Sequence, residues 1–168
     1  MTKTEVERRR RRRDDLGLVS FGFFLFLIGV IYVLNPSIGE DISAFFQPTN
    51  WKVVPVAPGV FLPAPMSHYP TLYLAVAEFA FIFGIFHVGI LAARFAIGSP
   101  LSQKASTVSS IVFWLGLGFF LDLLATGAIA WWEFATGAVI IIGLGLIAQG
   151  AALALGRSMA RERPHPYP

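Results

Sequence analysis

The chain has 168 residues, of which 55% are hydrophobic and only 14% are charged. A soluble domain of this length needs more charge to cover its surface, so the composition excludes an ordinary soluble protein. The sequence contains no cysteine, which excludes disulfides, thiolate metal sites, iron–sulfur clusters and cysteine nucleophiles.

Four apolar stretches run along the chain, and each is close to the ~20 residues that span a ~30 Å hydrocarbon core. They are Leu16–Leu34, Thr71–Ala93, Val108–Trp131 and Phe134–Leu155. We therefore predict an all-α polytopic membrane protein whose four transmembrane helices occupy residues 16–156. The first stretch lacks an A-x-A-like cleavage site, so we expect it to stay as a helix rather than to be removed as a signal peptide.

Basic residues are distributed unequally about these stretches. The N-terminal segment 1–15, the connection that holds Arg94 and Lys104, and the tail 157–168 contain all of the Lys and Arg residues except Lys52. With four spans these three regions fall on one side, and positively charged loops stay in the cytoplasm. We therefore predict a cell-membrane protein with both termini cytoplasmic. The six-arginine run is interpreted as a topology determinant against anionic headgroups, and no nucleic-acid partner is expected.

The connection 35–69 is long and proline-rich, and it is predicted to lie outside. Asn35-Pro36 ends the first helix, and residues 39–47 have the pattern of one or two helical turns. The run 53–67 holds four prolines and no charge, which excludes regular helix and central strand. Two interpretations stay open: a loop folded over the helix ends, or a docking surface for a neighbouring subunit.

The third and fourth stretches are almost continuous in sequence. A single helix of ~48 residues would be ~70 Å long, far more than a bilayer needs. We therefore predict a tight helical hairpin that turns near Trp131–Glu133, with Glu133 at the outer surface. Amphipathic rings that prefer the headgroup level mark the same boundary: Tyr32, Tyr69, Tyr73, Trp131 and Trp132.

Small residues recur at the spacing that lets transmembrane helices approach closely. This pattern predicts contacts among the second, third and fourth helices and leaves the Phe-rich first helix as the most lipid-exposed. The residues concerned are Ala80, Gly84, Gly89, Ala93, Gly116, Gly118, Ala148, Ala152 and Gly156.

Four polar side chains are predicted at membrane depth, where an ionisable group costs a few kcal/mol unless it finds a partner. Counted along the helices, Glu78 and Asp122 share a level in the outer half, and His87 and Gln149 share a deeper level. The two carboxylates could form a proton relay, a metal site or a substrate-binding pair, or could be structural groups that are protonated or bonded to a neighbouring helix. Glu78 and His87 are nine positions apart, so they face opposite sides of their helix.

Sequence motifs for chemistry are absent. A single intramembrane histidine, His87, is too few for a bis-histidine haem or a histidine-rich metal cluster, and there is no P-loop or dinucleotide-binding glycine pattern. The serines of the spans lack an accompanying base. We predict no catalytic residue, no metal site and no cofactor, and we do not expect an enzyme.

The stretches RRRRRRDDLGLVSFGFFLFLIGVIYVLNPSI, PAP and SPLSQKASTVSSIVFW resemble small uncharacterised four-helix membrane proteins of archaea. The resemblance implies a compartment and a helix count, and it carries over no activity and no functional residue.

Three functional hypotheses follow from the sequence. The first is a non-catalytic accessory or structural subunit of a larger membrane complex, with the lipid bilayer and other subunits or further copies as partners. The alternative is a small oligomeric transporter or proton-coupled channel that uses Glu78 and Asp122. The third is a membrane-embedded lipid or ligand binder.

Overall fold

The structure, a computed structural model, describes the backbone of residues 3–161 and the side chains of residues 16–156. The chain forms two units, Met1–Pro36 and Ser37–Pro168. The described part of the first unit is a single helix, α1 (Lys3–Leu34), so residues 3–15 of the basic segment continue into the first span without a break. The amide of Asn35 closes this helix by donating to the carbonyl of Ile31, ahead of the predicted stop at Pro36.

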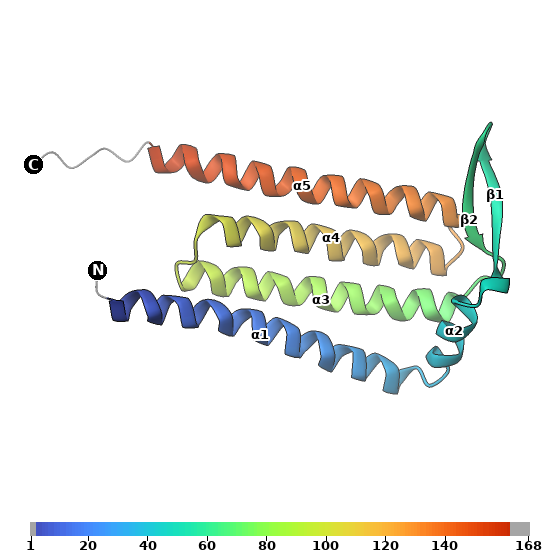
Figure 1. Ribbon diagram of the computed structural model, residues 1–168, viewed down its shortest axis with the longest axis horizontal. Helices are drawn as coiled ribbons and strands as arrows, with labels where there is room; N and C mark the ends of the chain where they lie inside the picture. The colour runs from blue at the N-terminus through green and yellow to red at the C-terminus, as the bar shows by residue number, and fades with distance from the viewer. Residues whose placement is uncertain (1–2, 162–168) are drawn as a thin grey trace, which may run out of the picture. The chain divides into compact units, whose positions relative to one another are not determined.

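The second unit holds three long helices, α3 (Pro70–Ala96), α4 (Leu101–Ala125) and α5 (Trp131–Arg161) (Figure 1). Together with Leu16–Leu34 of α1, these make four helices long and apolar enough to cross a membrane. The prediction of a mostly helical chain with four such helices is confirmed. Residues 162–168 of the predicted tail lie outside the described residues, whereas 157–161 continue α5.

The predicted boundaries of the third span were wrong by about two turns. The helix begins at Leu101, because the polar residues that follow Pro100 are helical although hydropathy does not mark them. It ends at Ala125, where Gly127 has a φ of +73° and the N–H of Ala128 donates to the carbonyl of Leu123. This arrangement is a glycine C-cap, so the turn precedes Trp131 instead of containing it.

Helix α4 packs against both α3 and α5, and glycines mark the closest approaches. A Cβ atom added at Gly84 of α3 would lie 2.7 Å from Leu115, and one added at Gly118 of α4 would lie 3.0 Å from Phe81. A Cβ added at Gly156 of α5 would lie 2.3 Å from Leu101. The predicted contacts of α4 with α3 and with α5 are confirmed, and among the glycines of the prediction only Gly89 has nothing near it.

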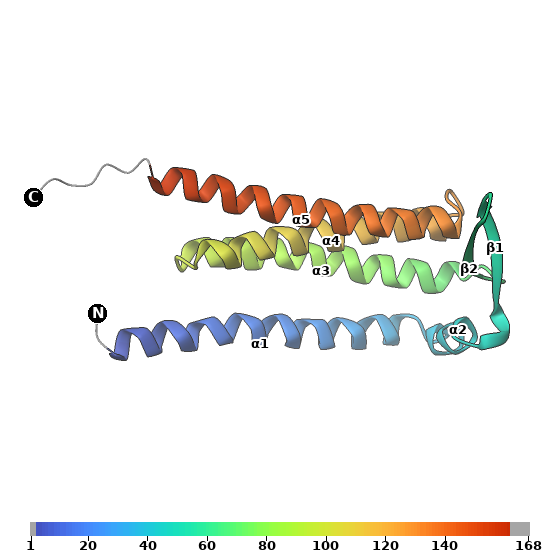
Figure 2. The ribbon, with the colours of Figure 1, turned by 45° about the horizontal axis from the view of Figure 1, so that its top comes forward.

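The segment before α3 differs from the all-α expectation. After α2 (Ile38–Phe45) and a 3-10 turn (Pro48–Asn50) come two antiparallel strands, β1 (Trp51–Ala57) and β2 (Val60–Pro65). Figure 2 shows this hairpin at the end of the helices where α5 begins. The helical turns expected within 39–47 are confirmed, whereas the hairpin was not predicted.

Prolines are tolerated in this hairpin because of their register. Trp51 pairs with Pro65, Val53 with Pro63, and Pro55 with Phe61, so every proline of the ladder falls on alternate pairs. The N–H of Met66 donates to the carbonyl of Asn50, which makes the intervening pairs the hydrogen-bonded ones. The missing N–H groups of proline would point away from the partner strand, and no ladder bond is lost. Pro58-Gly59 forms the turn, with φ +76° at Gly59 as a type II turn requires.

The hairpin and α2 pack on the helix ends, as the first interpretation of 35–69 expected. Apart from its neighbour Phe46, Phe45 lies close to four other rings, with centroids 5.1 Å from Trp51, 5.8 Å from Tyr69, 6.4 Å from Tyr73 and 5.9 Å from Trp131. We name these five residues the aromatic cap. The indole N–H of Trp131 donates to the carbonyl of Pro63 at 3.0 Å, which ties α5 to β2.

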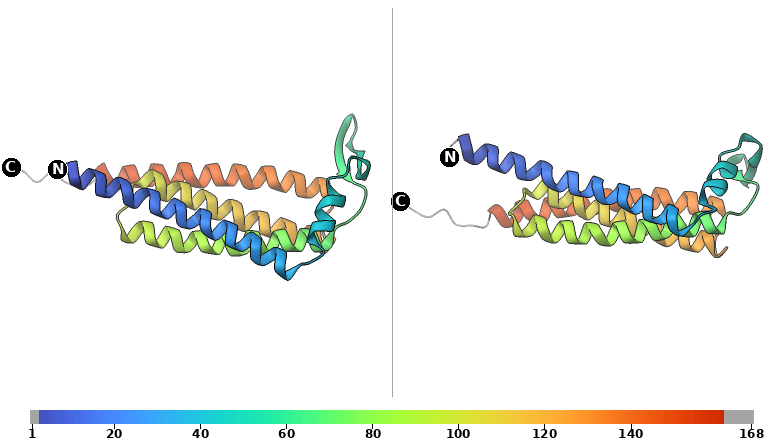
Figure 3. Two further views of the ribbon diagram at one scale, coloured as in Figure 1. Left: turned by 60° about the horizontal axis from the view of Figure 1, so that its bottom comes forward. Right: turned by 90° about the horizontal axis from the view of Figure 1, so that it is seen from below.

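The basic side chains described in the second unit lie at its two ends. Arg94 and Lys104 flank the short α3–α4 connection, which Figure 3 shows opposite the hairpin. Arg94 donates to the carbonyl of Gln103, and the Lys104 ammonium lies 4.3 Å from the centre of the Phe95 ring. Lys52 is on the hairpin, so the segregation of basic residues within this unit agrees with the pattern of the sequence.

Candidate functional site

Helix α3 carries an exposed stripe along the side opposite α4. Its members alternate at intervals of four and three residues, the spacing of a left-handed helix pair. We name this stripe the α3 seam; it consists of Glu78, Ile82, Ile85, Gly89, Ala92 and Ala96, all of them exposed. An apolar seam of this kind fits a further transmembrane helix as well as it fits lipid.

Glu78 is the one ionisable residue of the seam. It lies five residues beyond Tyr73 of the aromatic cap, about 7 Å along the helix axis toward the middle of the span. Its carboxyl group forms no hydrogen bond or ion pair with any residue that the structure describes. Between residues 16 and 34 of α1 the only polar side chains are Ser20 and Tyr32, so this apolar part of the helix contains no cation and no amide side chain.

Asp122 shares the level of Glu78 but lies on another side of α3. Contacts of Gly84 with Leu115 and of Gly118 with Phe81 set the register between α3 and α4, and this register places Asp122 within a residue or two of the level of Glu78. Asp122 follows Gly118 by four residues, so it lies on the face of α4 that packs on α3. Glu78 is on the far side of α3, and the structure does not bring the two carboxylates together.

His87 lies on the buried side of α3, opposite Glu78 as predicted. Its Nδ1 is 2.8 Å from the carbonyl oxygen of Phe83, to which it donates. The imidazole ring is 4.5 Å from the Phe83 ring, which in turn is 5.0 Å from Trp114 of α4. The histidine is therefore part of an aromatic contact between α3 and α4.

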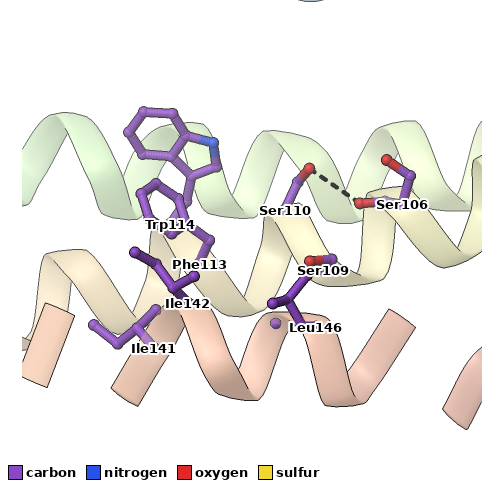
Figure 4. Close-up of a pocket in the computed structure, with 9 residues that line it drawn as sticks. Ser106, Ser109, Ser110, Phe113, Trp114, Ile141, Ile142 and Leu146 are labelled. Carbon is purple, nitrogen blue, oxygen red and sulfur yellow. Dashed lines mark hydrogen bonds between the residues drawn. The ribbon is translucent and has the colours of Figure 1, made fainter. Parts of the chain in front are cut away.

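A groove of about 240 Å³ runs between α4 and α5, away from the α3 seam. Figure 4 shows serines at one end of it and larger apolar side chains at the other. Ser106, Ser109 and Ser110 line the end nearer the start of α4; Phe113, Trp114, Ile141, Ile142, Gly145 and Leu146 complete the lining. The hydroxyl of Ser110 donates to the carbonyl of Ser106 at 3.1 Å.

Gln149 extends the polar end of this groove. It follows Leu146 by three residues on α5, so the two lie on neighbouring parts of one helix face. The contacts of Gly145 with Ser109 and of Gly156 with Leu101 set the α4–α5 register and place Gln149 level with Ser106. The same registers put Gln149 about one turn further from the hairpin than His87, so their predicted common level is not observed.

No three His, Asp or Glu side chains come together as metal ligands within the described part of the chain. The described residues form two surfaces along the apolar helices. One is the α3 seam, which contains the Glu78 carboxyl group, and the other is the α4–α5 groove, which has serine hydroxyls at one end. Both are suited to binding.

Comparisons with known proteins found no matching family model, no matching curated protein and no matching solved structure.

Sequence reasoning missed the groove serines as a group. Ser106 and Ser110 are four residues apart, which places them on one helix face. The sequence does not show that α5 leaves this face uncovered, so the groove could not be predicted. The aromatic cap was foreseen in part, because Tyr69, Tyr73 and Trp131 were predicted at one boundary. Phe45 and Trp51 join them only through the fold of the hairpin.

Proposed function

We propose that this protein is a non-catalytic subunit of a larger membrane assembly, attached through the α3 seam. The observation that carries the proposal is Glu78, an exposed carboxyl group in an otherwise apolar seam. A charged residue costs about 2.5–3.5 kcal/mol at the centre of a membrane helix and less toward the boundary, unless a partner satisfies it. A docked helix would supply that partner.

The partner is proposed to be a different chain. A second copy offers no Lys, Arg, Asn, Gln or His in the half of its spans that holds Glu78, because His87 and Gln149 both lie nearer the other end. The proposed partner is therefore a transmembrane helix that places a basic or amide side chain against Glu78 and packs a small-residue face on Gly89.

We propose a topology with both termini in the cytoplasm and the proline-rich segment outside. It is supported by Arg94 and Lys104, which lie at one end of the helices while the hairpin lies at the other. Positively charged connections are retained on the cytoplasmic side, and the N-terminal arginine run adds to this bias because α1 makes one crossing.

The test is recovery of the chain from native membranes in mild detergent at its natural expression level. Wild type is expected to co-migrate with at least one other protein. Glu78→Leu removes the carboxyl group and Gly89→Phe fills the open seam, so both should release the partner. Glu40→Gln, an exposed acid of α2, and Gly150→Phe, an open glycine of α5, are matched controls that should leave the assembly intact.

A monodisperse free monomer from wild-type membranes would contradict the proposal. Transport by Glu78 and Asp122 is the alternative, favoured by their common level and disfavoured by their positions on different sides of α3. Proteoliposome flux that is present in wild type and abolished by both Glu78→Gln and Asp122→Asn would support it.

A further inference from the structure

The groove between α4 and α5 has a polarity gradient along its length. Serine hydroxyls occupy the end near the α3–α4 connection, and Trp114, Ile141 and Ile142 occupy the other end. Gln149 follows Leu146 by three residues on α5, beyond the lining residues at the serine end. Ser106 and Ser110 lie five and nine residues from the start of α4, about 8 and 13 Å along the axis. Hydrogen-bonding groups therefore lie just inside the basic end of the span, and apolar surface lies deeper.

We propose that this groove binds one glycerolipid molecule from the leaflet at the Arg94 and Lys104 end. A membrane lipid has the same gradient, with oxygen atoms at glycerol depth and a hydrocarbon chain beyond them. The oxygens would accept hydrogen bonds from Ser106 and Gln149, neither of which forms a side-chain hydrogen bond among the described residues. One acyl chain would lie against Trp114, Ile142 and Leu146.

The size of the groove favours a lipid chain over a protein helix. A helix with its side chains is about 10–12 Å across, whereas 240 Å³ equals a cube only roughly 6 Å on a side. That space suits a segment of a single acyl chain. The site involves α4 and α5 only, so the inference is independent of docking at the α3 seam.

The experiment is native mass spectrometry of the full chain, purified in mild detergent and supplied with vesicles of dioleoyl phosphatidylglycerol and dioleoyl phosphatidylcholine. Wild type is expected to retain one lipid under conditions that strip detergent. Ile142→Trp fills the groove, and the double variant Ser106→Leu/Ser110→Leu removes hydroxyls. Each should raise the apparent Kd for lipid about tenfold, measured by titrating the lipid, which corresponds to about 1.4 kcal/mol.

Two controls match these changes in chemistry but lie outside the groove. Ile140→Trp introduces the same side chain at 53% exposure, against 52% for Ile142, and Ser20→Leu removes a hydroxyl from α1. Both should retain lipid as wild type does. Helix content measured by circular dichroism tests whether Ile142→Trp is folded, and it is expected to equal that of wild type because Ile142 is exposed.

Equal occupancy in wild type and all four variants would show an unspecific lipid shell, and absence of retained lipid in wild type would show no site; either result overturns the proposal. A photoreactive residue in place of Leu146 supplies a second measurement. A cross-link to lipid supports the site, whereas a cross-link to another protein or to α1 of the same chain overturns it.

Discussion

Single glycines determine how closely the helices of the second unit approach one another. At Gly84 the nearest atoms to an added Cβ belong to Leu115, one of them the backbone nitrogen at 3.3 Å. The backbone cannot move aside as the end of a flexible side chain can. Gly89, five residues further along α3, has no neighbouring atom within 4 Å of an added Cβ. Gly84 therefore lies at a helix contact, whereas Gly89 lies at the surface of the same helix.

We expect Gly84→Val to destabilise the protein by about 1–3 kcal/mol, because a larger side chain forces α3 and α4 apart. Gly89→Val is the matched control and should leave stability nearly unchanged. Thermal unfolding in detergent, followed by circular dichroism, compares the two. Equal midpoints for the two variants would show that the α3–α4 contact does not depend on Gly84.

Trp131 and Trp132 are adjacent but have different environments. Trp131 contacts three other residues of the aromatic cap and Phe134, and it donates to Pro63. Trp132 is 44% exposed. Trp131→Ala removes a half-buried ring with several ring contacts and should cost about 1–3 kcal/mol, whereas Trp132→Ala should cost within about 0.5 kcal/mol as a surface change.

The rate of proteolysis within residues 51–65 measures this difference, because loss of Trp131 frees the hairpin from α5. Cleavage should accelerate in Trp131→Ala alone. Equal acceleration in both variants would mean that the indole hydrogen bond and ring contacts do not hold the hairpin.

Among the elements, the number of long helices was predictable from the sequence, whereas the bounds of α4 and the β-hairpin were not. Four spans follow from hydropathy because lipid requires long apolar helices. The hairpin was missed because Pro55, Pro63 and Pro65 argue against a strand unless their register is known. Only alternate pairing, a property of two strands together, makes them compatible with a ladder.

The register makes a specific prediction about new prolines. Lys52 and Val53 are both exposed, but Lys52 belongs to a hydrogen-bonded pair with Ala64, and Val53 pairs with Pro63 outside the bonded set. Lys52→Pro should remove a ladder bond and cost about 1 kcal/mol or more, whereas Val53→Pro should be tolerated.

Hydrogen–deuterium exchange of the peptide that covers 51–65 distinguishes the two variants. Faster exchange is expected in Lys52→Pro only. If Val53→Pro gave the faster exchange, the register of the two strands would be wrong.

In the candidate sites, too, features of a single helix were predictable, whereas features that depend on two helices were not. The opposite placement of Glu78 and His87 follows from helical periodicity within one element, so it was predictable. The separation of Glu78 from Asp122 and the offset of Gln149 from His87 depend on how neighbouring helices align. That alignment depends on individual contacts such as Gly84 with Leu115, which a single sequence does not reveal.

At the scale of the whole molecule, the proposed orientation follows from charge. The absence of cysteine permits single-cysteine labelling with no background from the chain. In intact cells, a membrane-impermeant maleimide should label Phe61→Cys on the hairpin and should not reach Thr2→Cys or Ser102→Cys until the cells are opened. Labelling of Thr2→Cys in intact cells would overturn the orientation of the N-terminus.

The proposed function requires that a helix of another protein covers the α3 seam. The most direct measurement is photo-cross-linking in native membranes from a photoreactive residue at Ile85, which is 65% exposed in the seam, with Val139 on α5 as the control position. The account predicts one protein adduct from position 85, lost in Glu78→Leu, and none from position 139. Cross-links from position 85 only to lipid, or only to α1 of the same chain, would contradict it.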